Sequence, residues 1–365
     1  MVRDLILDAL RYWVMEMHVD GFRFDLASVL GRDRNGHVLA DAPLLERIAE
    51  DPILRDAKLI AEAWDAAGAY QVGNFSDRRW AEWNGRFRDD VRRFWRGDEG
   101  MTGRFASRIC GSSDLYGWRK GPECSINFTT CHDGFTLNDL VSYSHKHNTA
   151  NGENDRDGPS DNYSASYGME GASDDPATEM VRVRQIKNFL LTIAISRGVP
   201  MLLGGDEFRR SQEGNNNAYC QDNEVSWIDW SLLSRNNEVF QFARGALALR
   251  RAHSVLRREA FYTDEEICWF NPFGKCPNWS DPHQKCLACL IRSQDMADLF
   301  LMFNADSNPV TFAVPPPRSP HSWRLAADTA ASSPLDFYSP GEEAALANPA
   351  NYLVQSRSSV ILVAR

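Results

Sequence analysis

The sequence predicts a parallel α/β region followed by a smaller all-β region. Over residues 1–254, helical periodicity alternates with short apolar segments, and helix followed by strand is the repeating pattern of a parallel sheet. From about residue 255, short apolar segments separated by Pro, Gly, Asn and Ser replace the helices, which is typical of a β-sandwich. We therefore expect two domains, residues 1–254 and residues 255–365.

Each element of the first region has its own signal in the sequence. Apolar residues at steps of three or four predict amphipathic helices over residues 3–18, 41–50, 178–196 and 236–252. Short segments between them predict five strands, over residues 22–27, 59–64, 85–88, 125–131 and 199–203. Residues 144–176 are polar and rich in Asn, Asp, Ser and Gly, and a loop of this length in a compact domain is usually functional.

The second region is predicted to consist of short strands, which cover residues 267–270, 286–291, 297–303, 310–314, 323–326 and 359–363. Four cysteines in this region raise the question of a zinc site. Cys286 and Cys289 are three residues apart on one predicted strand, so their thiols should point to opposite faces of the sheet. We therefore expect buried, reduced thiols and no metal site.

Composition and charge exclude several classes of protein. Forty basic and fifty acidic residues give a net charge of −10, which makes nucleic acid an improbable partner. The sequence contains no apolar run near the roughly 18–20 residues that a membrane-spanning helix needs. The first residues do not have the layout of a secretory signal. We expect no membrane partner and a cytoplasmic protein, or a plastid protein if the source is a plant or an alga.

Three carboxylates lie at the ends of predicted strands: Asp25, Glu62 and Asp133. The carboxyl ends of the strands in a parallel barrel meet at one rim, where the active sites of such proteins lie. Each acid alone is equally explained as a helix cap or a surface ion-pair partner. Three in succession favour a site, and the chemistry that they suggest is glycosidic cleavage, which needs two carboxyl groups around the scissile bond.

The neighbours of these acids refine the prediction. Arg23 lies two residues before Asp25, so both side chains should share one face of the strand, and a guanidinium there favours an ionised nucleophile. The small apolar residues around Glu62 should raise its pKa, which suits a general acid. His132 is either a donor to a sugar hydroxyl or a core histidine bonded to the backbone. Three aromatic residues near strand ends either stack on glucose rings or pack in the barrel: Trp64, Tyr70 and Trp83.

Four motifs resemble those of the α-amylase clan of glycoside hydrolases: Gly21-Phe22-Arg23-Phe24-Asp25, Ala61-Glu62-Ala63-Trp64, Cys131-His132-Asp133-Gly134 and Gly204-Gly205-Asp206-Glu207. Further segments are similar to the isoamylase-type glycogen-debranching enzymes of that clan, namely residues 12–21, 70–73, 83–86, 148–158 and 221–227. The likeness is dense over residues 1–252 and loose in the β region.

The resemblance implies a (β/α)8 TIM-barrel fold and a retaining hydrolase of α-1,6 branches in glycogen, amylopectin or limit dextrins. It implies Asp25 as the nucleophile, Glu62 as the acid/base and Asp133 as the stabiliser of the transition state. Arg23 and His132 would hold the substrate and the nucleophile. The preference for α-1,6 over α-1,4 linkages, and a role of residues 144–176 in shaping the cleft for a branch point, follow from this resemblance alone.

The family barrel has eight strands, and this sequence opens in the helix before the fourth. We therefore expect an incomplete barrel with strands 4–8, whose open edges would expose unpaired backbone. A fragment, a split gene product or a truncated reading frame would explain the pattern. The expected partners are a branched α-glucan and either a missing N-terminal half or a second copy of the chain.

Other interpretations remain open at this stage. Residues 204–208 read Gly-Gly-Asp-Glu-Phe, the signature of diguanylate cyclases, but a polar loop follows where those enzymes have a strand. A non-catalytic glucan-binding or regulatory partner is favoured by the missing half and opposed by the intact carboxylates. We expect no obligatory cofactor, because nothing in the sequence defines a calcium site and residues 155–157 are equally explained as a solvated acidic loop.

Overall fold

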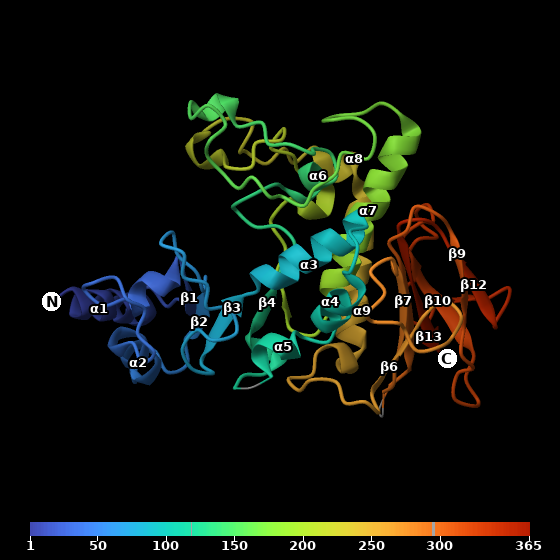
Figure 1. Cartoon of the computed structure of the whole chain (residues 1–365), viewed down its shortest axis with the longest axis horizontal. Helices are drawn as coiled ribbons and strands as arrows, with labels where there is room; N and C mark the ends of the chain where they lie inside the picture. The colour runs from blue at the N-terminus through green and yellow to red at the C-terminus, as the bar shows by residue number, and fades with distance from the viewer. Residues whose placement is uncertain (118, 294–295) are drawn as a thin grey trace.

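The computed structural model describes residues 1–117, 119–293 and 296–365. A parallel sheet with its helices occupies the part of the molecule nearer the N-terminus, and antiparallel sheets form the opposite end (Figure 1). A lobe that contains the long polar loop stands above them (Figure 1). In the described residues, no helix combines the length and the apolar character that crossing a bilayer would require.

The parallel sheet has five strands in the order β1-β2-β3-β4-β5, so consecutive strands of the chain are neighbours. All four neighbouring pairs are parallel. The strands are β1 Gly21–Phe24, β2 Lys58–Ala61, β3 Trp80–Trp83, β4 Ser125–Asn127 and β5 Val199–Pro200. This arrangement brings the residues that follow each strand to one edge of the sheet, as the sequence predicted.

Helices alternate with these strands. The longer ones are α1 Val2–Met15, α2 Pro43–Glu50, α3 Gly85–Arg96, α4 Thr102–Ile109, α7 Pro176–Ile195 and α9 Asn237–Ala252. Single turns of α-helix are α5 Ser113–Tyr116, α6 Leu137–Leu140 and α8 Leu232–Arg235. Short 3-10 segments are η1 Ala27–Gly31, η2 Pro122–Cys124, η3 Thr149–Asn151, η4 Asp206–Phe208, η5 Ala218–Cys220 and η6 Ser254–Leu256. Helix α7 begins at a strong local signal, because the Asp175 carboxylate accepts from the Thr178 amide and Pro176 occupies the first turn.

The predicted strand over residues 85–88 is wrong. These residues form the first turn of α3, and the third strand lies just before them as β3. The physical reason is the side chain of Asn84, whose Oδ1 accepts from the Phe87 amide at 2.9 Å and thereby caps the helix. The fourth and fifth strands are also shorter than predicted, because the chain leaves the sheet after Asn127 and after Pro200.

The C-terminal region contains a six-stranded antiparallel sheet in the order β11-β10-β13-β8-β7-β6 and a two-stranded sheet, β12-β9. Their bounds are β6 Ile267–Phe270, β7 Cys286–Ile291, β8 Leu299–Asn304, β9 Val310–Ala313, β10 Trp323–Asp328, β11 Ala344–Ala345, β12 Asn351–Val354 and β13 Ser358–Ala364. The sequence did not predict β11 or β12, which are short and largely exposed. Cys286 and Cys289 lie in different core clusters, so the prediction that their thiols point to opposite faces is confirmed.

One hydrophobic core joins the two regions. It combines buried residues of α3, α4, α7 and α9 with the inner face of β7, β8 and β13. Phe105 of α4, for example, packs edge-on against Phe303 of β8 with ring centroids 5.1 Å apart. A polar contact crosses the same boundary, because the Thr329 hydroxyl donates to the Asn188 side chain at 2.7 Å. Helices α3, α4, α7 and α9 therefore pack directly against the antiparallel sheet.

Candidate functional site

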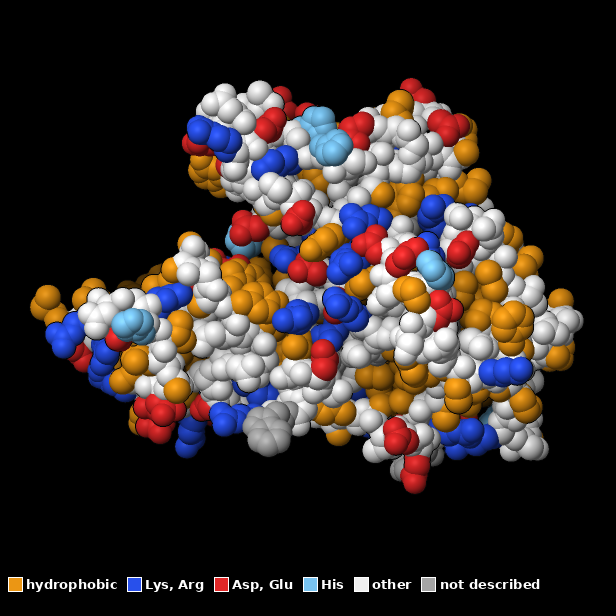
Figure 2. All heavy atoms as spheres, in the orientation of Figure 1, with side chains coloured by type: hydrophobic (Ala, Val, Ile, Leu, Met, Phe, Trp, Pro, Cys, Tyr) orange, Lys and Arg blue, Asp and Glu red, His pale blue; other side chains and the backbone are white. Residues whose placement is uncertain are grey.

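A cavity of about 520 Å³ opens at the carboxyl edge of the parallel sheet. In Figure 2 a hollow separates the upper lobe from the part of the molecule that contains β1–β3. Residues that follow three of the strands line the cavity together with residues of the lobe: Glu62, Trp64, Asp65, Tyr70, Gly85, Arg88, Cys131, Asp133, Gly158, Pro159 and Asn217. Four of the predicted site residues are in this lining: Glu62, Trp64, Tyr70 and Asp133.

Arg23 joins two of the three predicted carboxylates. Its Nη1 donates to Asp25 Oδ1 at 2.8 Å, and its Nη2 forms an ion pair with Glu62 Oε1 at 2.9 Å. The parallel pairing of β1 with β2 sets this distance, since Phe24 is the register partner of Ala61 and each acid follows directly. The prediction that Arg23 and Asp25 share a face is confirmed, and one guanidinium contacts both acids.

The two acids differ sharply in their surroundings. Glu62 is only 3% exposed, whereas 66% of the Asp25 side chain is exposed. Burial raises the pKa of Glu62, against the opposing effects of the Leu26 amide, which donates to Oε2 at 2.8 Å, and of Arg23. The expected rise in the pKa of Glu62 is therefore confirmed. A buried carboxyl with a raised pKa beside an exposed one is an arrangement suited to acid catalysis.

A chain of ring contacts leads from Arg23 to the third acid. The guanidinium carbon of Arg23 lies 4.0 Å from the centroid of the Trp83 ring, and the rings of Trp83 and His132 are 5.7 Å apart. His132 Nε2 is 3.6 Å from Asp133 Oδ1. Trp83 is buried, so one of its faces serves as a platform for Arg23. Thus six of the eight predicted residues form one connected group, of which Glu62 and Asp133 line the cavity.

Trp64 and Tyr70 form one wall of the cavity. Their rings are nearly parallel, 11° apart in orientation with centroids 6.1 Å apart. Gly85 lies against both rings, and a Cβ atom at this position would be 3.0 Å from Tyr70 Oη and 3.6 Å from the Trp64 ring. The absence of a side chain at position 85 therefore sets how deep the two rings sit.

Two ion pairs hold chain segments next to this wall. Arg32 binds Asp65 through Nε at 2.6 Å, and this contact holds the pKa of Asp65 at about 2. Lys120 donates to Glu82 Oε1 at 2.6 Å, and the other oxygen of Glu82 accepts from the Gly73 amide. The sequence did not single out these residues as part of the site. Asp65 directly follows the motif that contains Glu62, which is the signal that could have revealed it.

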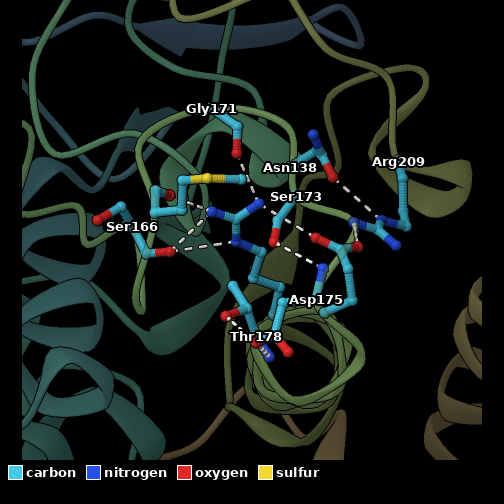
Figure 3. Close-up of polar contacts among 10 residues, drawn as sticks. Asn138, Ser166, Gly171, Ser173, Asp175, Thr178 and Arg209 are labelled. Carbon is cyan, nitrogen blue, oxygen red and sulfur yellow. Dashed lines mark hydrogen bonds and ion pairs between the residues drawn. The ribbon is translucent and has the colours of Figure 1, made fainter.

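Residues 144–176 supply the opposite wall through Gly158 and Pro159. Arg182 of α7 ties the end of this loop, since its guanidinium donates to the carbonyl of Ser166 at 2.8 Å and to that of Gly171 at 2.7 Å (Figure 3). At the other end, the Asn148 side chain donates to Asn216 Oδ1 at 2.8 Å. Hydrogen bonds thus fix the loop at both ends. Its cavity residues, Gly158 and Pro159, were not among the site residues predicted from the sequence.

Within the described ranges, no group of three or more His, Cys, Asp or Glu side chains is arranged to hold a metal ion. The acidic loop at residues 155–157 is engaged with amides instead. Asp157 Oδ2 accepts from the side chains of Asn151 at 2.7 Å and Asn217 at 2.9 Å.

The sequence of this chain is similar to those of known proteins. Over 352 residues the chain is 46% identical to the glycogen operon protein GlgX homolog of Mycobacterium tuberculosis, a match that covers 89% of this chain and 48% of that protein. Over 368 residues it is 43% identical to isoamylase 3, chloroplastic, of Oryza sativa subsp. japonica, covering 100% of this chain and 46% of the relative. The chain spans about half the length of the curated relatives it matches.

Solved structures share the fold. A pullulanase type I from Bacillus subtilis, solved with maltose, superposes with a TM-score of 0.70 at 21% identity, covering 99% of this chain and 46% of that one. The structure is therefore part of a TIM-type barrel followed by a C-terminal β domain. The isoamylase C-terminal family model matches residues 266–363. Over nearly its whole length the chain is thus similar to proteins named as glycogen operon protein GlgX homologs and isoamylases, and its residues 266–363 match the isoamylase C-terminal family.

Proposed function

We propose that this chain hydrolyses α-1,6-glucosidic branch linkages in glycogen, amylopectin or limit dextrins by a retaining mechanism. The observation that carries the proposal is the Arg23 guanidinium, which joins Asp25 and Glu62 at the edge of a cavity that Glu62 and Asp133 line. The names of the relatives, a glycogen operon protein and an isoamylase, support the substrate class and the linkage.

In the proposed reaction, Asp25 attacks the anomeric carbon while Glu62 gives its proton to the leaving oxygen. The C–O bond of the branch breaks and a covalent glucosyl ester forms on Asp25. Glu62 then takes a proton from water, whose oxygen attacks the anomeric carbon and releases Asp25. The exposed, guanidinium-paired Asp25 suits the nucleophile, and the buried Glu62 with its raised pKa suits the acid.

The remaining residues hold the sugar in this proposal. Asp133 accepts from hydroxyl groups of the glucosyl unit as positive charge develops on its ring. His132 donates to a hydroxyl of the same unit, and Arg23 fixes both reacting carboxylates. Trp64 and Tyr70 stack on neighbouring glucose rings, and Trp83 supports Arg23 from below.

We further propose that residues 1–254 form the barrel part and residues 255–365 the C-terminal β-sandwich, which contains the matched family region. Three more strands would complete the barrel, supplied by another part of a longer chain or by a second chain. Exposed apolar side chains on α1 support this proposal: Leu5, Tyr12, Trp13 and Met15. The described residues place no strand on the free side of β1. The proposed compartment is the cytoplasm, or the plastid in a plant or an alga.

The test is the release of reducing ends from amylopectin or glycogen by the purified chain, beside an Asp25→Asn variant. The proposal expects release by the wild-type chain and background release by the variant, with glucan binding retained in both. Binding without release would favour a second candidate, a non-catalytic glucan-binding partner, for which the open edge beside β1 is the supporting observation.

A further inference from the structure

The motif at residues 204–207 has no part in the proposed chemistry, although it is among the most distinctive in the sequence. It follows β5 and turns into η4, and Arg209 after it adopts a left-handed conformation with φ 67°. This geometry differs from the β-hairpin that carries the same letters in a diguanylate cyclase. The motif is therefore a turn at the carboxyl edge of the sheet, beside the segment that follows β4.

Asp206 contacts that neighbouring segment at two points. One carboxylate oxygen, Oδ2, accepts a hydrogen bond from the Thr130 hydroxyl. The other, Oδ1, accepts from the Leu137 amide at 2.8 Å. His132 and Asp133 lie between these two contacts, so a single carboxylate holds both ends of the loop that carries them.

The surroundings of Asp206 show that these two contacts are not incidental. The residue is 1% exposed, and burial raises its pKa to about 7. An acid that is kept out of water at such a cost needs strong hydrogen bonds in compensation, and Asp206 obtains them from the loop. Its neighbour Glu207 behaves differently, since its carboxylate accepts from the Gly205 amide within its own turn at 2.9 Å.

A second residue of the same turn reinforces the link. Figure 3 shows Arg209 directed toward Asn138 of α6, and its Nε donates to Asn138 Oδ1 at 3.0 Å. Arg209 Nη2 also binds Glu179 Oε2 of α7 at 2.7 Å. The Gly134 amide donates to the carbonyl of Asn216 at 2.9 Å, which fixes the middle of the loop. The turn after β5 is thus attached to the Asp133 loop and, through α7, to the main core.

We propose that Asp206 is a positioning residue, which holds residues 130–137 so that His132 and Asp133 reach the same sugar as Asp25 and Glu62. The inference rests on the proposed function, because that function places Asp133 on the substrate. The claim that the buried Asp206 carboxylate keeps residues 130–137 ordered can be tested independently of that function.

The experiment compares the full chain with three variants, Asp206→Ala, Asp206→Asn and, as the matched control, Glu207→Ala. Hydrogen exchange measured by mass spectrometry reports the order of residues 128–140, and α7 and β13 report the fold as a whole. Loss of two hydrogen bonds in Asp206→Ala should speed exchange in residues 128–140 by about tenfold or more, with α7 and β13 unchanged. Asparagine keeps an acceptor for the Leu137 amide and a polar partner for Thr130, so Asp206→Asn should restore exchange to within about threefold of wild type.

Turnover of branched glucan supplies the second measurement. Asp206→Ala should lower kcat by about 10–100-fold with KM changed by less than about threefold, and Asp206→Asn should recover most of this loss. Wild-type exchange in Asp206→Ala, an equal effect of Glu207→Ala, or global loosening in both Asp206 variants would overturn the inference. If the wild-type chain releases no reducing ends, the proposed function fails, and the exchange measurement still decides whether Asp206 holds the loop.

Discussion

The two sides of the cleft carry their carboxylates in different ways. Asp25 and Glu62 each follow their strand directly, so the pairing of β1 with β2 places them and Arg23 closes the gap. Asp133 comes six residues after Asn127, the end of β4, and its position depends on contacts from distant segments. A side chain next to a strand is thus placed by local structure, whereas one on a loop is placed by tertiary contacts.

Exposure does not follow the same division. Glu62 is buried against the sheet, whereas 66% of the Asp25 side chain and 64% of the Asp133 side chain are exposed. We expect changes on the Glu62 side to act through chemistry and core stability, and changes on the Asp133 side to act through loop order.

The largest effect should come from removing the proton donor. Replacing Glu62 with Gln should lower turnover by about 10²–10⁴-fold and leave glucan binding nearly intact, because proton transfer alone is lost. Glu46→Gln, an exposed change on α2, is the matched control. Initial rates of reducing-end release with parallel binding isotherms give the measurement, and equal activity in Glu62→Gln would refute the assignment.

A second large effect concerns the buried ion pair next to the Trp64 and Tyr70 wall. Lys120→Met removes the cation from a buried pair and leaves the Glu82 carboxylate uncompensated. The free energy of unfolding should fall by about 3–5 kcal/mol. Urea unfolding followed by circular dichroism measures this change, with the exposed Lys275→Met as the control. A loss as small as that of the control would show that the buried pair does not stabilise the fold.

The buried acid should also leave a signature in the pH dependence of stability. Folding raises the pKa of Glu62 above its ordinary value of 4.5, so below that value both states are protonated and the residue has no effect. As the pH rises through the raised pKa, the unfolded chain releases the proton more readily and wild-type stability falls. Urea unfolding from pH 4 to 8 should therefore show Glu62→Gln gaining stability relative to wild type at the higher pH. A difference that is constant with pH would contradict the raised pKa.

The smallest effect should follow a change beneath the rings. In Gly85→Ala the new Cβ would lie 3.0 Å from Tyr70 Oη, so the ring must shift. Loss of one well-placed stacking contact should weaken maltooligosaccharide binding by about 2–10-fold. Alanine favours the first turn of α3, so the melting temperature should not fall. Calorimetric titration and a thermal melt separate the two outcomes, and unchanged binding would remove Tyr70 from the site.

The difference between the two sides also explains what the sequence could predict. The spacing of Arg23 from Asp25 was sufficient to place both on one face, and Ala61 and Ala63 were sufficient to indicate a buried Glu62. The role of Asp206 was not predictable, because its partners Thr130 and Leu137 are some seventy residues away in the chain. Residues 85–88 were misassigned because the prediction overlooked Asn84, whose side chain caps the helix that begins there. Within the C-terminal sheets, β12 was not predicted. Only Val354 of its four residues is buried, so the sequence there lacks the apolar pattern of a strand.

The central claim is that Asp25, with Glu62 beside it, attacks the anomeric carbon of a glucosyl unit. α-Maltosyl fluoride needs no proton to lose its fluoride, so in Glu62→Gln the first step can proceed while the second, which needs a base, is slow. Mass spectrometry of the digested variant should then find a maltosyl group on the peptide that contains Asp25. A maltosyl group on another carboxylate, or fluoride release that leaves Asp25 unmodified throughout the reaction, would contradict the account.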